Sequence, residues 1–304
     1  MRVPALRHLI VTADDFGLDL AINEAVEQAF DAGSLTAASL MVGQSAAADA
    51  VARARRLPGL RVGLHVTLTG GARPLLPPQR VPDLVDADGR LPTRLAAFGV
   101  RLAASAAARR QAEQEIRAQF QWFADSGLPL DHANAHQHYH MHPFVLDAML
   151  RIGAGFGLRA VRVPFEPLWL ARAVPASAGH AGRLGALGWA AGTARMRRRI
   201  RRAGMACNDY LFGLRCSGRL DASALCRAVD ELRPGIVEMY LHPATRNGPA
   251  ELAAGVGSHA RGEFEALIHA ATRAHVRALA ASAGGSLGGY LDIPGPGAAG
   301  AAAA

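Results

Sequence analysis

Histidines are concentrated in one short stretch of this chain. The segment HANAHQHYHMH, residues 132–142, contains five of the twelve histidines, and all five fall on even-numbered positions. Imidazole nitrogens bind divalent metal ions and exchange protons near neutral pH, so the stretch predicts metal or acid–base chemistry. A tag-like or metal-storage tract is the alternative, but the apolar and turn residues around the segment are those of structured sequence.

Residues of the same chemical kind end several separate apolar runs. LIVTA leads into Asp14 and Asp15, VGL into His65, and MYL into His242. In a parallel α/β barrel the carboxyl ends of all strands meet on one face, so these side chains are predicted to converge with the histidine-rich stretch. Taken singly, each has a plainer explanation, because an aspartate can cap the next helix and a lone histidine is more often part of the core. The predicted convergence is therefore the functional signal.

Spacing limits how many of the clustered histidines one ion can bind. In an extended strand His136, His138 and His140 would point to one side, with about 13 Å between the first and the last at roughly 3.3 Å per residue. A divalent ion binds its nitrogen ligands at about 2 Å. One ion therefore takes one or two of these histidines, and the others face substrate, bulk water or the ligands themselves.

Strand-like runs alternate with helical patterns along the chain. The strand-like runs are residues 8–13, 38–42, 60–68, 131–140, 158–164 and 236–243, and the helical patterns are residues 18–33, 46–56, 110–126, 143–156, 221–233 and 262–281. The alternation predicts an α/β fold with a parallel sheet and helical crossovers, closed into a barrel or an incomplete barrel. An open doubly wound sheet is the alternative.

We predict a single domain over residues 1–293. Residues 165–214 break the alternation, are rich in glycine, alanine, arginine and tryptophan, and are interpreted as a basic and aromatic insertion. Residues 294–304, PGPGAAGAAAA, lack the side chains for a core and are predicted to be a disordered tail.

Composition limits the kinds of binding partner and the cellular compartment that we expect for this chain. Half of the 304 residues are hydrophobic, and the net charge of +8 includes 33 basic residues that are all arginine. No nucleic-acid-binding motif accompanies the arginines, so nucleic acid is not an expected partner. The first residues form neither a signal peptide nor a membrane span, and the three cysteines form no CxxC pair. These features favour a cytoplasmic chain.

Four motifs that span nearly the whole chain carry a family resemblance. They are TADDFG at 12–17, VGLHVTLT at 62–69, NAHQHYHMHP at 134–143 and EMYLHP at 238–243. In this order they resemble the YdjC-like carbohydrate deacetylases, distant relatives of the polysaccharide deacetylases. The resemblance implies a modified (β/α) TIM-like barrel, one divalent metal ion, and hydrolysis of the N-acetyl group of an amino sugar.

The resemblance also assigns roles to matching residues. It implies Asp15, His65 and His136 as metal ligands, Asp14 as the general base and His242 as the general acid. One carboxylate and two imidazoles leave coordination positions open for water and an acetamide oxygen, as a catalytic site requires. This ligand set suits zinc, while the family is also associated with magnesium.

Two further positions bear on the same site. Arg162, in VRVP, matches a strand-end arginine that orients Asp14, with a purely structural arginine as the alternative. Family members often have an aspartate just before the histidine triplet, where this chain has Asn134. The neutral amide leaves the local charge less negative and supplies no carboxylate for acid–base chemistry there.

Within the family the chain looks like the hopanoid-biosynthesis-associated branch. The features are NAH in the histidine motif, FEPLWLARA at 165–173 and the arginine-rich insertion. The implied substrate is an N-acetylglucosaminyl hopanoid lipid. One alternative is a soluble chitooligosaccharide or N-acetylglucosamine deacetylase. Another is a non-catalytic metal- or sugar-binding protein, although binding alone requires neither a base such as Asp14 nor an acid such as His242.

Residues 184–202, LGALGWAAGTARMRRRIRR, suit a peripheral contact with a membrane. Leucines and Trp189 begin the segment and a dense arginine cluster ends it, a composition fit for the surface of an anionic bilayer. We therefore expect peripheral association with the inner membrane. A solvated basic helix, or one packed on another subunit, is the alternative, and the oligomeric state is left open.

Overall fold

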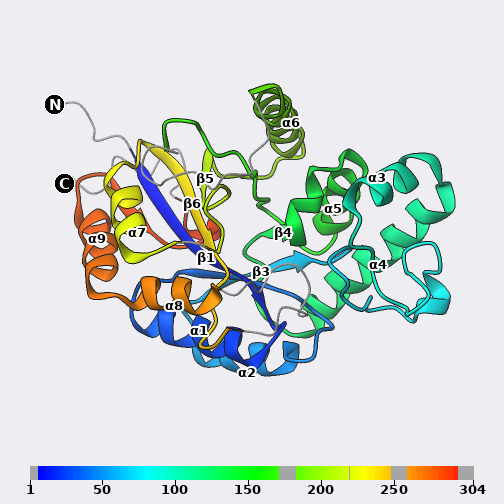
Figure 1. The fold of residues 1–304 in the computed structure, drawn as a ribbon, viewed down its shortest axis with the longest axis horizontal. Coiled ribbons are helices and arrows are strands. Elements are labelled where there is room, and N and C mark those ends of the chain that lie inside the picture. The colour runs from blue at the N-terminus through cyan, green and yellow to red at the C-terminus, as the bar shows by residue number, and fades with distance from the viewer. Residues whose placement is uncertain (1–5, 171–182, 219, 248–258, 294–304) are drawn as a thin grey trace.

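A parallel sheet forms the centre of the molecule (Figure 1). The computed structural model describes residues 6–170, 183–218, 220–247 and 259–293, so the predicted tail lies outside the described residues. The sheet has seven strands in the order β4-β3-β2-β1-β6-β5, and β7 also pairs with β1. The strands are β1 (Arg7–Phe16), β2 (Ala37–Leu40), β3 (Arg61–Val66), β4 (Ala133–Ala135), β5 (Tyr210–Phe212), β6 (Gly235–Leu241) and β7 (Gly285–Leu287).

Strand β1 is the central strand of the sheet. It is buried along nearly its whole length, which agrees with an apolar run that does not alternate with polar residues. Strand β6 pairs with it from Arg7 to Ala13, while β7 and β2 share the opposite edge. Strands from both ends of the chain are therefore fixed to β1.

The sheet is not continuous between β4 and β5. Among the residues that the structure describes, isolated bridges alone span this gap, joining Ala133 with Val161 and Ala160 with Ala206. The side-chain amide of Asn208 accepts from the N–H of Val163 at 2.6 Å and donates to its carbonyl oxygen at 2.9 Å, so a side chain takes the place of a strand partner. The parallel α/β class is confirmed. Of the predicted alternatives, the incomplete barrel is the one observed: the sheet is an open half-barrel and not a full TIM barrel. The predicted strand over residues 158–164 is wrong, because this segment forms only the isolated bridges.

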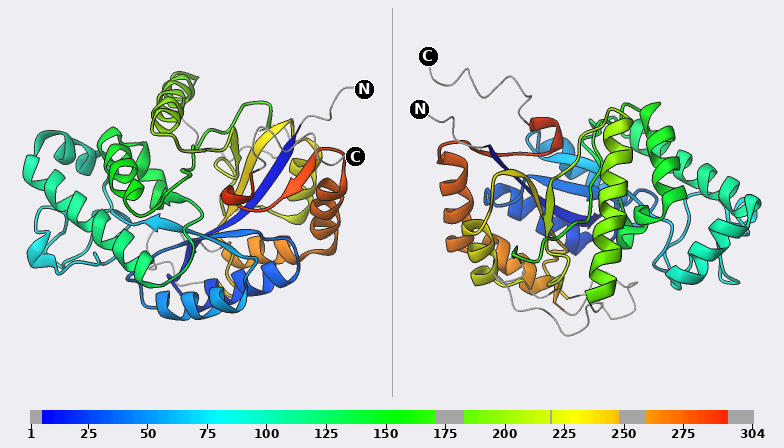
Figure 2. Two further views of the ribbon diagram at one scale, coloured as in Figure 1. Left: turned by 180° about the vertical axis from the view of Figure 1, so that it is seen from behind. Right: turned by 90° about the horizontal axis from the view of Figure 1, so that it is seen from above.

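Helices pack around the sheet. They are α1 (Leu20–Asp31), α2 (Ala47–Arg56), α3 (Leu95–Ala104), α4 (Ala106–Asp125), α5 (Pro143–Ala154), α6 (Arg183–Arg202), α7 (Ala222–Asp230), α8 (Ala260–Ile268) and α9 (Ala270–Ala281). Figure 1 shows α1, α2 and α8 along one side of the strands and α3 to α5 at the end near β4. Helix α6 contacts α5 and stands between these two parts of the molecule when it is seen from above (Figure 2).

Local capping explains where helices begin. The Asp19 carboxylate accepts the backbone N–H of Ala21 at 2.7 Å and so caps α1. The predicted helix over 262–281 is two helices, because His269 has an extended backbone and its ring accepts the N–H of Ala271 at 3.2 Å. That capping bond begins α9 as a separate helix.

The predicted insertion contributes to the sheet as well as to α6. Strand β5, within residues 165–214, pairs with β6, and Met196 and Ile200 of α6 are buried in the core. Part of this segment therefore belongs to the half-barrel. Among the described residues, no helix is long and apolar enough to cross a membrane.

Candidate metal and acid–base site

The three predicted metal ligands meet at the carboxyl ends of neighbouring strands. Asp15 lies near the end of β1, His65 near the end of β3, and His136 directly after β4. His65 Nε2 and His136 Nδ1 lie 3.2 and 3.0 Å from Asp15 Oδ1. One ligand atom from each residue falls within 4.8 Å of the others, and all three side chains are buried. The predicted ligands therefore form a compact group.

The chemistry of this group fits a divalent metal ion. Asp15 Oδ2 is buried and has no hydrogen-bond partner among the described residues, a costly state for a carboxylate oxygen unless a cation or water meets it. Burial alone would raise the pKa of Asp15, but His136 and His65 hold that pKa well below its usual range. An ionised carboxylate with two imidazoles is a donor set that zinc and similar ions accept.

The backbone is strained where the group forms. Asp15, Gln137 and His138 have φ angles of 62°, 55° and 53°, and they are the only non-glycine residues of the described chain with positive φ. Such conformations cost on the order of 1–3 kcal/mol each and cluster at functional sites. All three of these residues are predicted ligands or lie within two residues of one.

The clustered histidines do not continue the strand. Strand β4 ends at Ala135, and His136–Met141 form the 3-10 turn η2, so the predicted strand over 131–140 is wrong beyond that point. The other two histidines of this turn contact different groups. His138 Nε2 lies 3.2 Å from the Tyr240 hydroxyl, and His140 Nε2 lies 3.1 Å from the Arg162 carbonyl oxygen. Within this turn, only His136 joins the metal-ligand group found among the described residues.

Asp14, the predicted base, is held by Arg162. Both side chains are buried, and Nη1 and Nη2 of the guanidinium donate to Oδ2 and Oδ1 at 2.5 and 2.9 Å. Burial alone would raise the pKa of Asp14, but Arg162 and then His65 hold that pKa well below its usual range. The carboxylate is therefore ionised at neutral pH and fixed in one orientation.

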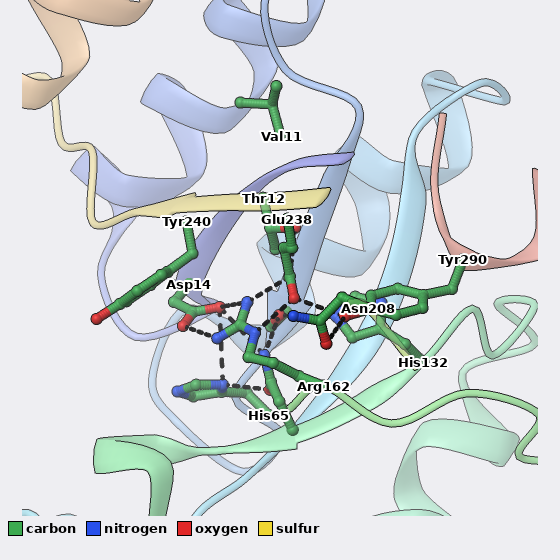
Figure 3. Close-up of polar contacts among 12 residues, drawn as sticks. Val11, Thr12, Asp14, His65, His132, Arg162, Asn208, Glu238, Tyr240 and Tyr290 are labelled. Carbon is green, nitrogen blue, oxygen red and sulfur yellow. Dashed lines mark hydrogen bonds and ion pairs between the residues drawn. The ribbon is translucent and has the colours of Figure 1, made fainter. Parts of the chain in front are cut away.

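Sequence reasoning missed Glu238, which holds Arg162 from the other side (Figure 3). Nε and Nη2 of Arg162 donate to its carboxylate at 2.9 and 2.7 Å. Glu238 also accepts the hydroxyls of Thr12 at 2.7 Å and Tyr290 at 2.6 Å. The sequence did contain a signal, because a glutamate inside the apolar run IVEMYL is buried only if it is paired.

Charge in this cluster is unbalanced. The buried carboxylates of Asp14 and Glu238 share the guanidinium of Arg162, while the buried carboxylate of Asp15 faces the rings of His65 and His136. A buried charge is stable only with a compensating partner. Three carboxylates with one guanidinium leave an excess of negative charge, which favours a bound cation.

His242, the predicted acid, faces the same pocket. The pocket has a volume of about 200 Å³ and is lined by Asp14, His65, Ala135, His136, Gln137, His138, Ser217, Tyr240 and His242. His242 Nδ1 lies 3.2 Å from the Ser217 hydroxyl, and its backbone N–H donates to Glu263 at 2.7 Å. A larger cavity of about 480 Å³ between α7 and α9 contains none of the predicted site residues. The smaller pocket is thus lined by the predicted base, the predicted acid and two of the three predicted ligands, His65 and His136.

Fold and site define a parallel α/β half-barrel with a candidate metal centre at the carboxyl edge of its sheet. The family described as YdjC-like protein matches residues 8–278, and the chain belongs to this family. A solved structure from Enterococcus faecalis, of a candidate cellobiose-phosphate cleavage protein, matches with a TM-score of 0.74 at 21% identity and covers 96% of this chain and 100% of that chain. At this identity the likeness shows the fold alone.

Several relatives are named as deacetylases. A carbohydrate deacetylase of Mus musculus is 31% identical over 278 residues, covering 86% of this chain and 85% of the relative. A carbohydrate deacetylase of Brevibacillus brevis is 37% identical over 162 residues, 53% of this chain and 60% of the relative. A chitooligosaccharide deacetylase of Serratia marcescens is 37% identical over 136 residues, 44% of this chain and 51% of the relative. The chain thus spans only about half to three fifths of the two bacterial relatives.

Proposed function

We propose that this chain is a metal-dependent deacetylase that hydrolyses the N-acetyl group of an amino sugar. The observation that carries the proposal is the position of the group formed by Asp15, His65 and His136, which adjoins a pocket lined by Asp14 and His242. The names of the relatives support the substrate class.

The position and charge of each residue support the roles that we propose. Asp15, His65 and His136 hold the ion. When bound, a divalent ion polarises a carbonyl and lowers the pKa of water. Asp14, ionised and fixed by Arg162, accepts the proton of the water that attacks the acetamide carbon.

The departing nitrogen needs a proton, because an amine anion is too basic to leave. His242 lines the pocket with Asp14, and it donates that proton. The C–N bond breaks and the products are acetate and a free amino sugar.

For the substrate we propose an N-acetylglucosaminyl hopanoid lipid. Exposed apolar side chains support a lipid, because Leu168 is 68% exposed and Trp189 is 37% exposed. Trp189 Nε1 donates to the Pro164 carbonyl oxygen at 2.7 Å, which places this surface beside the segment that carries Arg162. A soluble chitooligosaccharide is the alternative substrate, favoured by the relative from Serratia marcescens.

A peripheral contact of α6 with anionic lipid would bring such a substrate to the pocket. Arg195, Arg198 and Arg202 are exposed on this helix. Helix α6 also contacts η2, the turn that supplies His136. The basic helix therefore lies beside the metal-ligand turn.

Acetate release from defined substrates tests the proposal. The purified protein, loaded with zinc or magnesium, is incubated with acetylglucosaminyl hopanoid in mixed micelles and, separately, with diacetylchitobiose. We expect acetate from the hopanoid, and none from the Asp15→Asn variant. Release from diacetylchitobiose alone would assign the enzyme to soluble sugars, and release from neither would contradict the deacetylase assignment.

A further inference from the structure

A chain of buried polar residues runs from His65 away from the pocket and into the protein. Its members are Asn134, Ser39, His132 and Asp131, and each of them is 0% exposed. None of them belongs to the metal-ligand group or lines the pocket. Burying polar side chains costs free energy, so a buried polar network outside the pocket calls for an explanation.

The orientation of Asn134 follows from the charge of its neighbour. Its amide faces Asp14 Oδ1 at 3.3 Å, and an ionised carboxylate only accepts hydrogen bonds, so the NH2 group must be on that side. The amide oxygen then faces His65 Nδ1 at 2.6 Å. His65 must therefore carry a proton on Nδ1, so Nε2, which faces Asp15 Oδ1 at 3.2 Å, is the ring nitrogen on the side of the metal-ligand group.

The remaining bonds all point in the same direction. Asn134 Nδ2 donates to Ser39 Oγ at 2.9 Å, and the Ser39 hydroxyl lies 3.0 Å from His132 Nε2. His132 Nδ1 lies 2.8 Å from Asp131 Oδ2. Since the carboxylate accepts from Nδ1, His132 Nε2 has a lone pair and accepts the hydroxyl proton of Ser39. The donors thus run without interruption from His65 to Asp131.

The carboxyl end of this relay is fixed by the last part of the described chain. Asp131 accepts the backbone N–H groups of Tyr290 and Leu291 at 3.0 and 2.9 Å. The ring of Tyr290 packs on His132 with 5.0 Å between centroids. Although burial alone would raise the pKa of Asp131, His132 and these backbone donors hold that pKa below its usual value. The relay therefore ends on a negative charge.

Strand β3 leaves room for the imidazole ring of His132. A Cβ atom at Gly63 of β3 would lie 2.5 Å from His132 Nδ1, so any larger residue would displace the ring. The absence of a side chain at Gly63 therefore allows His132 to occupy its place in the relay.

Ser39, His132 and Asp131 also have the connectivity of a nucleophilic triad. All three are sealed from solvent, and Ser39 lies within β2, so no substrate reaches the hydroxyl. A hydrolytic role for this serine is ruled out by access.

We infer that Asp131, His132, Ser39 and Asn134 are positioning residues that fix His65 in its Nδ1-protonated form and direct Nε2 to the metal ion. The inference rests on the proposed metal site. A metal-ligating histidine commonly donates its second ring N–H to a carboxylate or carbonyl, which sets the ring orientation and raises its basicity. Here a neutral amide contacts the ring and the carboxylate lies at the end of the relay.

Zinc affinity tests the inference without reference to turnover. The Ser39→Ala variant removes the central link, and we expect its zinc dissociation constant, measured by competition with a chromophoric chelator, to rise about 10- to 100-fold. The matched control is Ser34→Ala, which also removes a fully buried serine hydroxyl, one that donates to the Ala29 carbonyl oxygen at 3.1 Å. The control should bind zinc as the wild type does.

A second measurement needs no variant. Long-range ¹H–¹⁵N spectra of the metal-free wild-type protein should show the His65 proton on Nδ1. An unprotonated Nδ1, or equal zinc affinity in Ser39→Ala and Ser34→Ala, overturns the relay while zinc binding and deacetylation by the wild type leave the proposed function standing. A wild-type protein that binds no zinc overturns both.

Discussion

Asp14 and Asp15 are consecutive residues, yet both carboxylates serve one site. Neighbouring residues of a regular strand point to opposite faces of the sheet. Here the pairing of β1 with β2 shifts register between Ala13 and Phe16, and Asp15 has a φ angle of 62°. This local irregularity lets Asp14 meet Arg162 while Asp15 meets His65 and His136. The two neighbouring carboxylates thus contact different partners within one candidate site.

Replacing Asp14 should separate proton transfer from metal binding. Asp14→Asn keeps the shape of the side chain but removes the base, so we expect kcat to fall about 100-fold or more while bound metal stays at the wild-type level. Steady-state kinetics and elemental analysis of the same sample measure both quantities. Unchanged kcat would show that another group takes the proton.

Glu238 should affect catalysis through Arg162. Glu238→Gln removes the charge that fixes the guanidinium, so Asp14 loses its fixed orientation and kcat should fall by up to about 100-fold, with a loss of stability of about 1–3 kcal/mol. The matched control is Glu115→Gln, a buried glutamate that accepts the backbone N–H groups of Leu75 and Leu76.

Denaturant unfolding and kinetics compare these two glutamine variants. Both should lose stability, but only Glu238→Gln should lose kcat after correction for folded protein. An equal fall in kcat for both would reduce Glu238 to a structural residue.

The loss of rate caused by replacing His242 should be larger for a more basic leaving group. His242→Ala should slow hydrolysis of an N-acetyl amino sugar about 100-fold or more. An acetyl ester of a nitrophenol should be cleaved at close to the wild-type rate, because that leaving group departs without a proton. Equal losses on both substrates would remove His242 from the role of acid.

The arginines of α6 should control binding to anionic vesicles. Not all are free for lipid, because the chain itself binds three of them: Arg197 to the Asp209 carbonyl oxygen, Arg199 to Asp147 and Arg201 to Asp209. The informative variant therefore changes the exposed Arg195, Arg198 and Arg202 to Gln. At about 1 kcal/mol for each basic residue near the surface, affinity should fall about 100-fold.

A control of equal charge tests whether position matters. It changes three exposed arginines elsewhere on the surface, Arg80, Arg94 and Arg110, to Gln. In co-sedimentation with phosphatidylserine vesicles at low salt, wild type and control should pellet and the α6 variant should not. Binding by the α6 variant equal to that of the control would show that α6 is not the contact.

The residues of the candidate site were easier to predict from the sequence than the backbone conformation around them. Asp15, His65 and His136 come together as expected, because parallel strands end at one edge and each of these residues closes an apolar run. The turn at η2 could not be predicted, because Gln137 and His138 have a left-handed backbone that is usually indicated in a sequence by glycine.

The remaining features that the sequence did not predict are short strands and contacts between residues far apart in the chain. Strands β5 and β7 are three residues each, which is too short for a periodic pattern. Tyr290 supports both Glu238 and the relay at Asp131, but it lies 52 and 159 residues away from them. Contacts between such distant residues arise from the pairing of β7 with β1, which no local motif encodes.

The most direct test of the account is the metal content of two ligand variants. Wild type, Asp15→Asn and His136→Ala are purified side by side, equilibrated with zinc, passed over a desalting column and analysed for metal and acetate release. The account predicts a single bound ion per wild-type chain, and loss of both metal and activity in each variant, with chelation inactivating the wild type reversibly. Full metal occupancy in both variants would contradict it.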